Sequence, residues 1–159
     1  MFPQRMRAVL LERACSALDS VSRRSGVDGP VHLAVGTEGE DAAFFHLLRA
    51  GYTVVARRWS AGNLPGDMDL IAWHGDLLCF FEIKTRTSHD ETPAETAIDR
   101  HKRGVLRRLA RAYLRQLGQS EQPPTRFDAI SVYLIPGHKP EIEHFENAFG
   151  WQEWRNPAF

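Results

Sequence analysis

The sequence predicts one layered α/β domain, in which helices flank a mixed central sheet and a helical extension precedes it. Two observations lead to this prediction. The chain of 159 residues has an ordinary globular composition, 43% hydrophobic and 25% charged, and its expected elements follow the order helix, three strands, helix, strand. A chain of this length can bury a hydrophobic core without disulfides or structural metals.

The N-terminal segment is expected to be an appendage to this domain. Residues 5–18 fit a helix with apolar side chains on one side, and residues 20–30 collect Ser, Gly, Asp and Pro, which is typical of a loop. We therefore divide the chain into an N-terminal extension, residues 1–33, the α/β domain, residues 34–150, and a C-terminal tail, residues 151–159.

The domain is expected to begin with a helix and three strands. Four apolar residues between Ala43 and Leu48 fall on one face of a helix over residues 39–50, which Gly51 ends. Strands are expected at residues 52–56, 69–73 and 77–84. The last two flank a three-residue turn, which predicts a hairpin.

A long second helix and a fourth strand follow. The run Thr92-Pro93-Ala94-Glu95 has the pattern of a capping box with proline at the first helical position, and it predicts a helix over residues 93–117. Residues 127–135 are expected to form a strand. Residues 138–159 hold four glutamates and two tryptophans, and no element is predicted for them.

Composition also limits the class of protein. Twenty Lys and Arg balance 20 Asp and Glu, which argues against a surface that is basic throughout but leaves room for a local basic patch. No apolar run approaches the roughly 18–20 residues of a membrane helix. The two cysteines, Cys15 and Cys79, lack a metal-ligand spacing, so we expect free thiols, a cytoplasmic protein and no membrane contact.

Charged side chains interrupt two of the apolar strands. Side chains alternate along residues 77–84, so Glu82 and Lys84 share one face at the end of a strand that is otherwise apolar on both faces. Asp69 begins the preceding strand. Because an unpaired buried charge costs several kcal/mol, such groups must pair or bind a metal.

Two carboxylates beside a lysine suit phosphodiester hydrolysis. Mg²⁺ or Mn²⁺ prefers hard oxygen ligands, polarises the phosphate and lowers the pKa of an attacking water, while a lysine stabilises the charge that develops on the phosphate. The residues also allow plainer interpretations, in which Glu82 and Lys84 form a solvated ion pair and Asp69 is a turn carboxylate.

Charges on both helices point toward the same region. Glu40 shares the apolar face of its helix, and Lys102 falls within the apolar stripe of Ile98, Val105, Leu109 and Tyr113. We expect both to face the charged end of the sheet. The alternatives are that Glu40 only favours the helix dipole and that Lys102 reaches out to solvent along its own stem.

The second helix is strongly basic. Residues 100–115 contain seven Arg or Lys and no acid, so Arg107, Arg111 and Arg115 are expected to be exposed and to contact DNA phosphates. The equally weighted alternative is a solvated helix face that the acidic C-terminal segment balances.

A series of short motifs resembles the YraN family, over residues 36–149. They are Gly36-x-x-Gly39-Glu40, Gly51-Tyr52, Gly66-Asp67-Met68-Asp69, Phe81-Glu82-Ile83-Lys84, Lys102, Arg126-Phe127-Asp128 and His144-x-x-Asn147-Ala148-Phe149. That family is itself uncharacterised and is similar to archaeal Holliday-junction resolvases of the PD-(D/E)xK nuclease superfamily.

The resemblance implies a restriction-endonuclease-like fold and a site with named roles. Asp69, Glu82 and Glu40 would be the metal ligands, Lys84 the catalytic lysine, and Lys102 a further residue of the site. Two positions depart from the pattern: Asp67 stands where a longer acid is usual, and Arg58 stands where an asparagine is expected before the tryptophan.

The implied function is a divalent-metal-dependent endonuclease for DNA, with branched DNA as an expected substrate. By analogy, a symmetric homodimer suits the cutting of two strands. A non-catalytic nucleic-acid-binding or assembly module, and a purely structural ion-pair network, are the alternatives, since a fold alone does not establish function.

Overall fold

The computed structural model describes residues 31–89, 98–118 and 121–152. Within them lie two helices and five strands, which are α2 (Val31–Arg49), β1 (Thr53–Trp59), β2 (Met68–His74), β3 (Leu77–Arg86), α3 (Arg100–Leu117), β4 (Thr125–Tyr133) and β5 (Glu141–Phe149). The predicted helix over residues 5–18 and the capping box at Thr92 lie outside the described residues.

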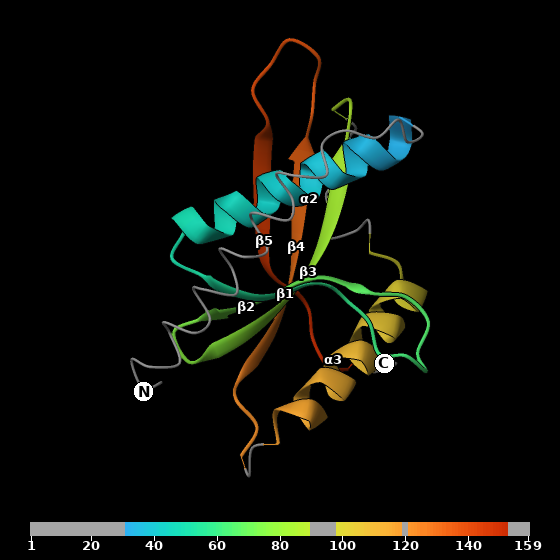
Figure 1. The fold of residues 1–159 in the computed structure, drawn as a ribbon, viewed down its shortest axis with the longest axis vertical. Coiled ribbons are helices and arrows are strands. Elements are labelled where there is room, and N and C mark those ends of the chain that lie inside the picture. The colour runs from blue at the N-terminus through green and yellow to red at the C-terminus, as the bar shows by residue number, and fades with distance from the viewer. Residues whose placement is uncertain (1–30, 90–97, 119–120, 153–159) are drawn as a thin grey trace, which may run out of the picture.

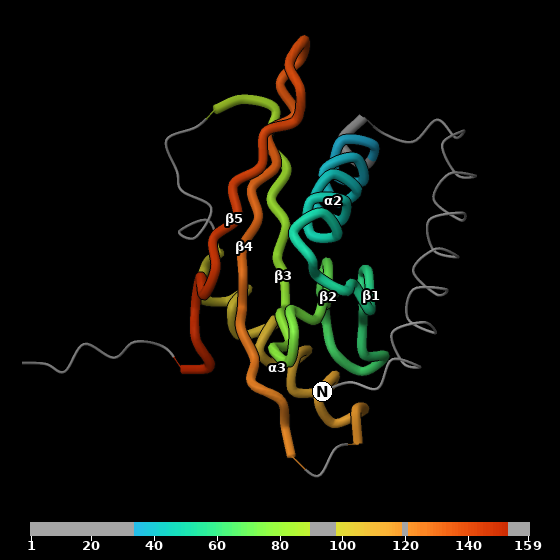
Figure 2. The backbone as a smooth tube through the Cα atoms, turned by 90° about the vertical axis from the view of Figure 1, so that its left-hand side faces the viewer, coloured from blue at the N-terminus to red at the C-terminus, as the bar shows by residue number. Residues whose placement is uncertain are grey.

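The strands form one twisted sheet in the order β1-β2-β3-β4-β5. β3 and β4 run parallel, while the other neighbouring pairs are antiparallel, so the sheet is mixed. α2 lies on one face of the sheet and α3 on the other, as Figures 1 and 2 show. The predicted α/β class is therefore confirmed, and the architecture is consistent with a restriction-endonuclease-like fold.

Each helix covers its own hydrophobic cluster. On the α3 face, Val105 and Leu109 are buried against sheet residues such as Phe80, which confirms the predicted apolar stripe. On the α2 face, Phe44 and Leu47 are buried with other sheet residues, among them Phe81. Neither helix of the described part of the chain is long and apolar enough to cross a membrane.

Several element boundaries differ from the predicted ones. α2 begins at Val31, inside the segment assigned to the extension, and it carries Gly36 and Gly39 in its interior. The second helix begins at Arg100 rather than at residue 93, because the Asp99 backbone is extended and its carboxylate accepts a hydrogen bond from Lys102 N at 2.8 Å.

β5 was not predicted. It pairs with β4 through a register that has an irregularity between Phe127 and Ala129, and most of its side chains are exposed or half-buried. An edge strand of this kind lacks the clear alternation of apolar and polar residues that marks a strand with one buried face.

Gly39 allows α2 to approach β3 closely. A Cβ at this position would lie 1.9 Å from Thr85 Oγ1, whereas a Cβ at Gly36 would meet nothing within 4 Å. We expect Gly39→Ala to destabilise the protein by about 2 kcal/mol or more, since a packed helix must move to admit the methyl group. Gly36→Ala is the matched control and should be stabilising by about 0.5–1 kcal/mol. Urea unfolding of both variants measures the difference, and equal effects would contradict the close approach.

Candidate functional site

The pairing of β2 with β3 brings Asp69 beside Glu82. The antiparallel register sets Leu70 opposite Phe81, and its continuation by one residue sets Asp69 opposite Glu82 on the same face. Asp69 Oδ2 also accepts a hydrogen bond from Ile83 N at 2.7 Å. The two predicted carboxylates therefore lie side by side on the α3 face.

Glu82 is almost completely buried and contacts two lysines. Its side chain is 3% exposed, with Oε1 3.1 Å from Lys84 Nζ and Oε2 3.0 Å from Lys102 Nζ. The contact with Lys102 is an ion pair at the distance of a charge-assisted hydrogen bond. The structure thus brings Lys84 from β3 and Lys102 from α3 to one carboxylate.

Glu40 reaches this region from α2 but is held by an arginine. Arg58 Nε and Nη2 donate to the two oxygens of Glu40 at 2.6 and 3.0 Å, and Nη2 also donates to Thr37 Oγ1 at 3.2 Å. The backbone of Arg58 has a φ of 46°, a conformation that asparagine adopts more readily than most residues.

The charges of these residues influence one another. Burial raises the pKa of Asp69 to about 7, and the nearby charges of Glu82 and Glu40 add to the rise. The hydrogen bond to Glu40 raises the pKa of Arg58, as do the charges of Asp67 and Asp69. Burial would lower the pKa of Lys102, but Glu82, Asp69 and Asp67 raise it overall. The acids and cations thus form one electrostatic group.

The raised pKa of Asp69 predicts a pH-dependent stability in the absence of metal. An unfolded aspartate ionises near 3.8, so folded Asp69 retains its proton to higher pH, and stability from this group is lost as pH rises from about 4 to about 7. As pH rises from roughly 5 to 8, the free energy of unfolding of Asp69→Asn should therefore increase relative to that of wild type by about 1 to 2 kcal/mol.

Urea unfolding at several pH values in EDTA measures this effect. Asparagine keeps an oxygen that can accept the hydrogen bond from Ile83 N. Exposed Glu38 on α2 provides the control variant Glu38→Gln, which should follow the wild-type curve. A stability difference between Asp69→Asn and wild type that stays constant with pH would contradict the raised pKa of this half-buried carboxyl.

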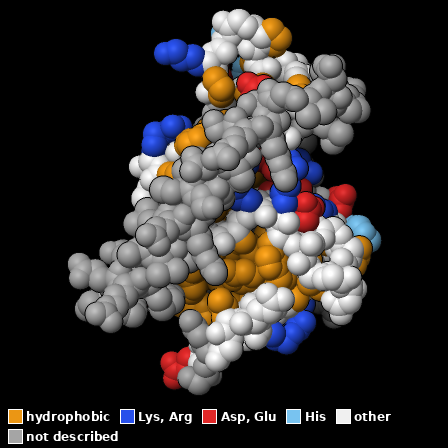
Figure 3. Space-filling model, in the orientation of Figure 1, with side chains coloured by type: hydrophobic (Ala, Val, Ile, Leu, Met, Phe, Trp, Pro, Cys, Tyr) orange, Lys and Arg blue, Asp and Glu red, His pale blue; other side chains and the backbone are white. Residues whose placement is uncertain are grey.

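The acids are not arranged as a finished metal site. In the part of the chain that the structure describes, no three His, Cys, Asp or Glu side chains form a group that could hold a metal as they stand. Asp69 and Glu82 are adjacent, while Glu40 faces Arg58. Figure 3 shows acidic and basic side chains gathered side by side below α2, rather than one wholly basic surface.

The basic helix differs from its prediction at Arg107. This side chain is 7% exposed, its Nε donates to Gly150 O at 2.8 Å, and its guanidinium lies 5.4 Å from the ring centre of Phe149. The expectation that Arg107 is exposed was wrong, because the chain at the end of β5 covers that flank of α3. Arg111 and Arg115 are exposed as predicted.

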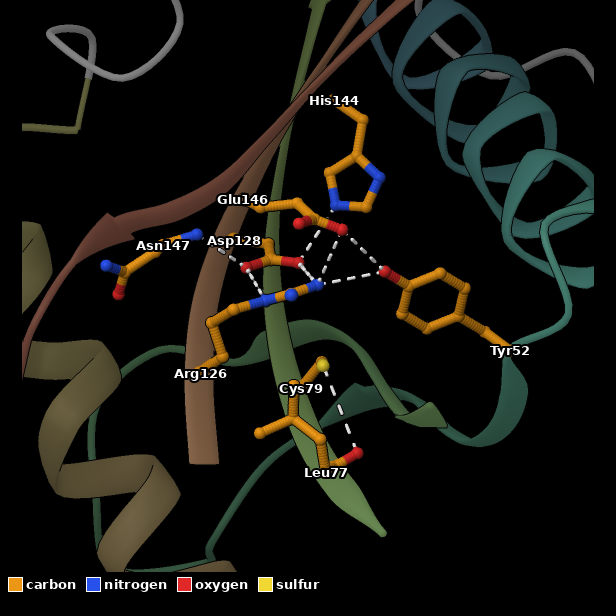
Figure 4. A network of polar contacts seen from close by, with 8 residues as sticks. All are labelled: Tyr52, Leu77, Cys79, Arg126, Asp128, His144, Glu146 and Asn147. Carbon is orange, nitrogen blue, oxygen red and sulfur yellow. Dashed lines mark hydrogen bonds and ion pairs between the residues drawn. The ribbon is translucent and has the colours of Figure 1, made fainter. Parts of the chain in front are cut away.

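A second charged network lies on the α2 face and was not predicted as a unit. Fully buried Asp128 accepts from Arg126 Nε and Nη2 at 2.7 and 2.8 Å and from Asn147 N at 2.9 Å, and His144 Nε2 lies 2.9 Å from its Oδ2 (Figure 4). Burial alone would raise the pKa of Asp128, but these hydrogen bonds and the charge of Arg126 lower it.

The network continues to the edge of the molecule. Arg126 Nη2 also donates to Tyr52 Oη at 2.9 Å and to Glu146 Oε1 at 3.1 Å. A signal for it was present in the sequence, because Asp128 is a single acid within the apolar strand 127–135, as Glu82 is within 77–84. The network joins β4, β5 and the start of β1, so its geometry indicates a structural role.

Comparison with known proteins identifies relatives over most of the chain. A UPF0102 protein of Koribacter versatilis is 48% identical over 122 residues, covering 77% of this chain and 83% of that protein. A UPF0102 protein of Solibacter usitatus is 42% identical over 114 residues, covering 72% and 84% respectively. One from Rhodococcus jostii is 37% identical over 118 residues, covering 74% and 98%.

The model of the uncharacterised protein family UPF0102 matches residues 39–132, a range that holds all five of the candidate residues Glu40, Asp69, Glu82, Lys84 and Lys102. UPF0102 is the family that the motifs indicated as YraN. The chain belongs to the uncharacterised protein family UPF0102.

Proposed function

We propose that this protein is a divalent-metal-dependent nuclease that hydrolyses phosphodiester bonds of branched DNA. The observation that supports it most is the pair of adjacent carboxylates, Asp69 and Glu82, with Lys84 and Lys102 on Glu82. A buried acid, a half-buried acid and two cations at one point of a sheet are costly to maintain for stability alone.

The residues present suit Mg²⁺ or Mn²⁺. Glu82 is buried with both carboxylate oxygens in contact with lysines, and burial, followed by the nearby charge of Glu82, raises the pKa of Asp69. Both supply the hard oxygen ligands that these ions prefer. Asp69 and Glu82 would hold the ion, which when bound polarises the phosphate and lowers the pKa of an attacking water.

The other side chains have distinct tasks in this proposal. Lys84 is 37% exposed, so its ammonium group can reach a DNA phosphate and stabilise the negative charge that develops there. Lys102 holds the second oxygen of Glu82 and so orients that carboxylate. Glu40 would become a metal ligand only by giving up its hydrogen bonds to Arg58. In this proposal Arg58 therefore positions the Glu40 carboxylate.

A non-catalytic DNA-binding module is the second candidate, and one observation favours it. Both oxygens of Glu82 already contact lysines, and both oxygens of Glu40 contact Arg58, so the charges balance without a metal.

A cleavage screen separates the two candidates. Duplex, single-stranded, flap and four-way-junction DNA are incubated with Mg²⁺ or Mn²⁺, with EDTA as the control. The nuclease should cut a branched form, and metal at a hundredfold excess over its Kd should stabilise the protein by about 2.7 kcal/mol. No cleavage with either metal, together with no metal-dependent stabilisation, would leave the binding module as the better explanation.

A further inference from the structure

An open pocket lies at the C-terminal end of α3, away from the acidic residues of the candidate site. Its lining comes from α3, from the segment before β4 and from the segment after β5, and consists of Arg111, Leu114, Arg115, Gln122, Trp151 and Gln152. Its volume of about 390 Å³ is within the usual range of small-molecule sites, roughly 300–1,000 Å³. Such a space admits one nucleotide but not a duplex.

The pocket has two cations with no acidic partner among the described residues. Arg111 and Arg115 are exposed, and neither forms an ion pair with an acid of the described residues. By contrast, Arg57, Arg58 and Arg126 all have carboxylate partners. Two neighbouring guanidinium groups that are not neutralised by carboxylates can bind one phosphate through several charge-assisted hydrogen bonds.

An aromatic ring is fixed beside these cations. Trp151 Nε1 donates to Thr125 Oγ1 at 2.8 Å, and the indole packs at an angle on Phe127 with ring centres 4.8 Å apart. The guanidinium of Arg111 lies 5.2 Å from the centre of the Trp151 ring, so the indole orders this arginine. Arginine planes and aromatic rings are the groups on which unpaired bases stack.

The amides complete a set of groups that suits a nucleotide. Gln122 and Gln152 each offer both hydrogen-bond donors and acceptors, so they can serve different base edges.

The pocket lies within reach of the candidate site along α3. Arg111 follows Lys102 by nine residues, which is ~14 Å along the helix axis at 1.5 Å per residue. A strand of a few nucleotides can span this distance.

We propose that this pocket binds one unpaired nucleotide of a DNA strand, with its phosphate on Arg111 and Arg115 and its base beside Trp151 and the two amides. This inference rests on DNA being the substrate of the proposed function. It adds a preference for substrates with a single-stranded part, such as a flap or an open junction arm.

The test measures DNA affinity of the full chain in EDTA, where the proposed cleavage cannot occur. Fluorescence anisotropy with a labelled single-stranded oligodeoxynucleotide and with the corresponding duplex gives the ratio of the two affinities. Arg111→Gln/Arg115→Gln is compared with Arg100→Gln/Arg108→Gln, a matched pair that removes the same charge from exposed positions of the same helix. Thermal melting verifies that both variants are folded.

The pocket variant should lose single-strand affinity about tenfold or more relative to duplex affinity, while the control pair should leave the ratio unchanged. A deoxynucleoside monophosphate should displace the oligonucleotide from wild type at lower concentration than inorganic phosphate or the deoxynucleoside. Equal losses in both variants, equal competition by inorganic phosphate, or no single-strand binding by wild type would each overturn the proposal. Because metal is absent, a failure here is distinct from a failure to cleave.

Discussion

Under the proposed function, Glu82→Gln is expected to reduce metal-dependent DNA cleavage by roughly a thousandfold, because it removes a proposed metal ligand and the charge that orients two lysines. The side chain keeps its size, and both lysines are about a third exposed, so they can turn toward solvent. We therefore expect a stability loss of no more than about 2 kcal/mol. Binding of DNA in EDTA should persist or become tighter, because a negative charge has gone.

The matched control for this variant is Glu38→Gln, which removes an acid from the exposed side of α2, two residues from Glu40. Its cleavage rate should equal that of wild type. The measurements are initial cleavage rates on a four-way junction and thermal melting with and without Mg²⁺. Full activity of Glu82→Gln would exclude this site as the catalytic centre. Complete unfolding of the variant would favour the structural ion-pair network instead.

Strand periodicity explains why part of the candidate site could be predicted. Side chains alternate strictly along a strand, so the placement of Glu82 and Lys84 on one face followed from the apolar residues around them. The predicted hairpin made residues 69–73 and 77–84 neighbouring strands, and the structure pairs them. The meeting of Asp69 with Glu82, by contrast, was expected from their charges and from the family resemblance.

The contacts of the helical residues could not be predicted in the same way. The partner of Glu40 depends on the backbone at Arg58, whose positive φ is a property of the folded chain. Likewise, the periodicity of the second helix placed Arg107 on the side opposite the apolar stripe, but its burial depends on Phe149 at the end of β5 and on Gly150 after it. Because β5 is an edge strand without a clear alternation of apolar and polar residues, the sequence did not predict that the end of β5 covers α3 at Arg107.

Asp128 shows that a single acid within an apolar strand also occurs away from the proposed metal site. Both are single acids in apolar strands, and both are buried against cations. The difference lies in the face of the sheet. Asp128 neighbours Phe81 across the β3–β4 pair and so lies on the α2 face, whereas Glu82 lies on the α3 face. A single acid in an apolar strand therefore predicts that the acid is paired with a cation, but it does not predict a catalytic role.

We expect Asp128→Asn to destabilise the protein by about 3 kcal/mol. The negative charge is lost, and the amide NH2 takes the place of the oxygen that faces the guanidinium of Arg126 and the imidazole of His144 in a buried network. Glu146→Gln is the matched control, since Glu146 contacts the same arginine through a side chain that is 56% exposed. Exposed pairs contribute about 0–1 kcal/mol, so this variant should differ little from wild type.

At acid pH, the difference in free energy of unfolding between Asp128→Asn and wild type should disappear. The pKa of Asp128 is lower in the folded protein than the 3.8 of an unfolded aspartate, so its contribution is present above about pH 4 and is lost as pH falls through the folded pKa. Urea unfolding near pH 7 and at acid pH measures both effects. Because the network lies on the α2 face, cleavage per folded molecule should be unchanged. Equal stability losses in Asp128→Asn and Glu146→Gln would show that burial of this carboxylate adds nothing to the network.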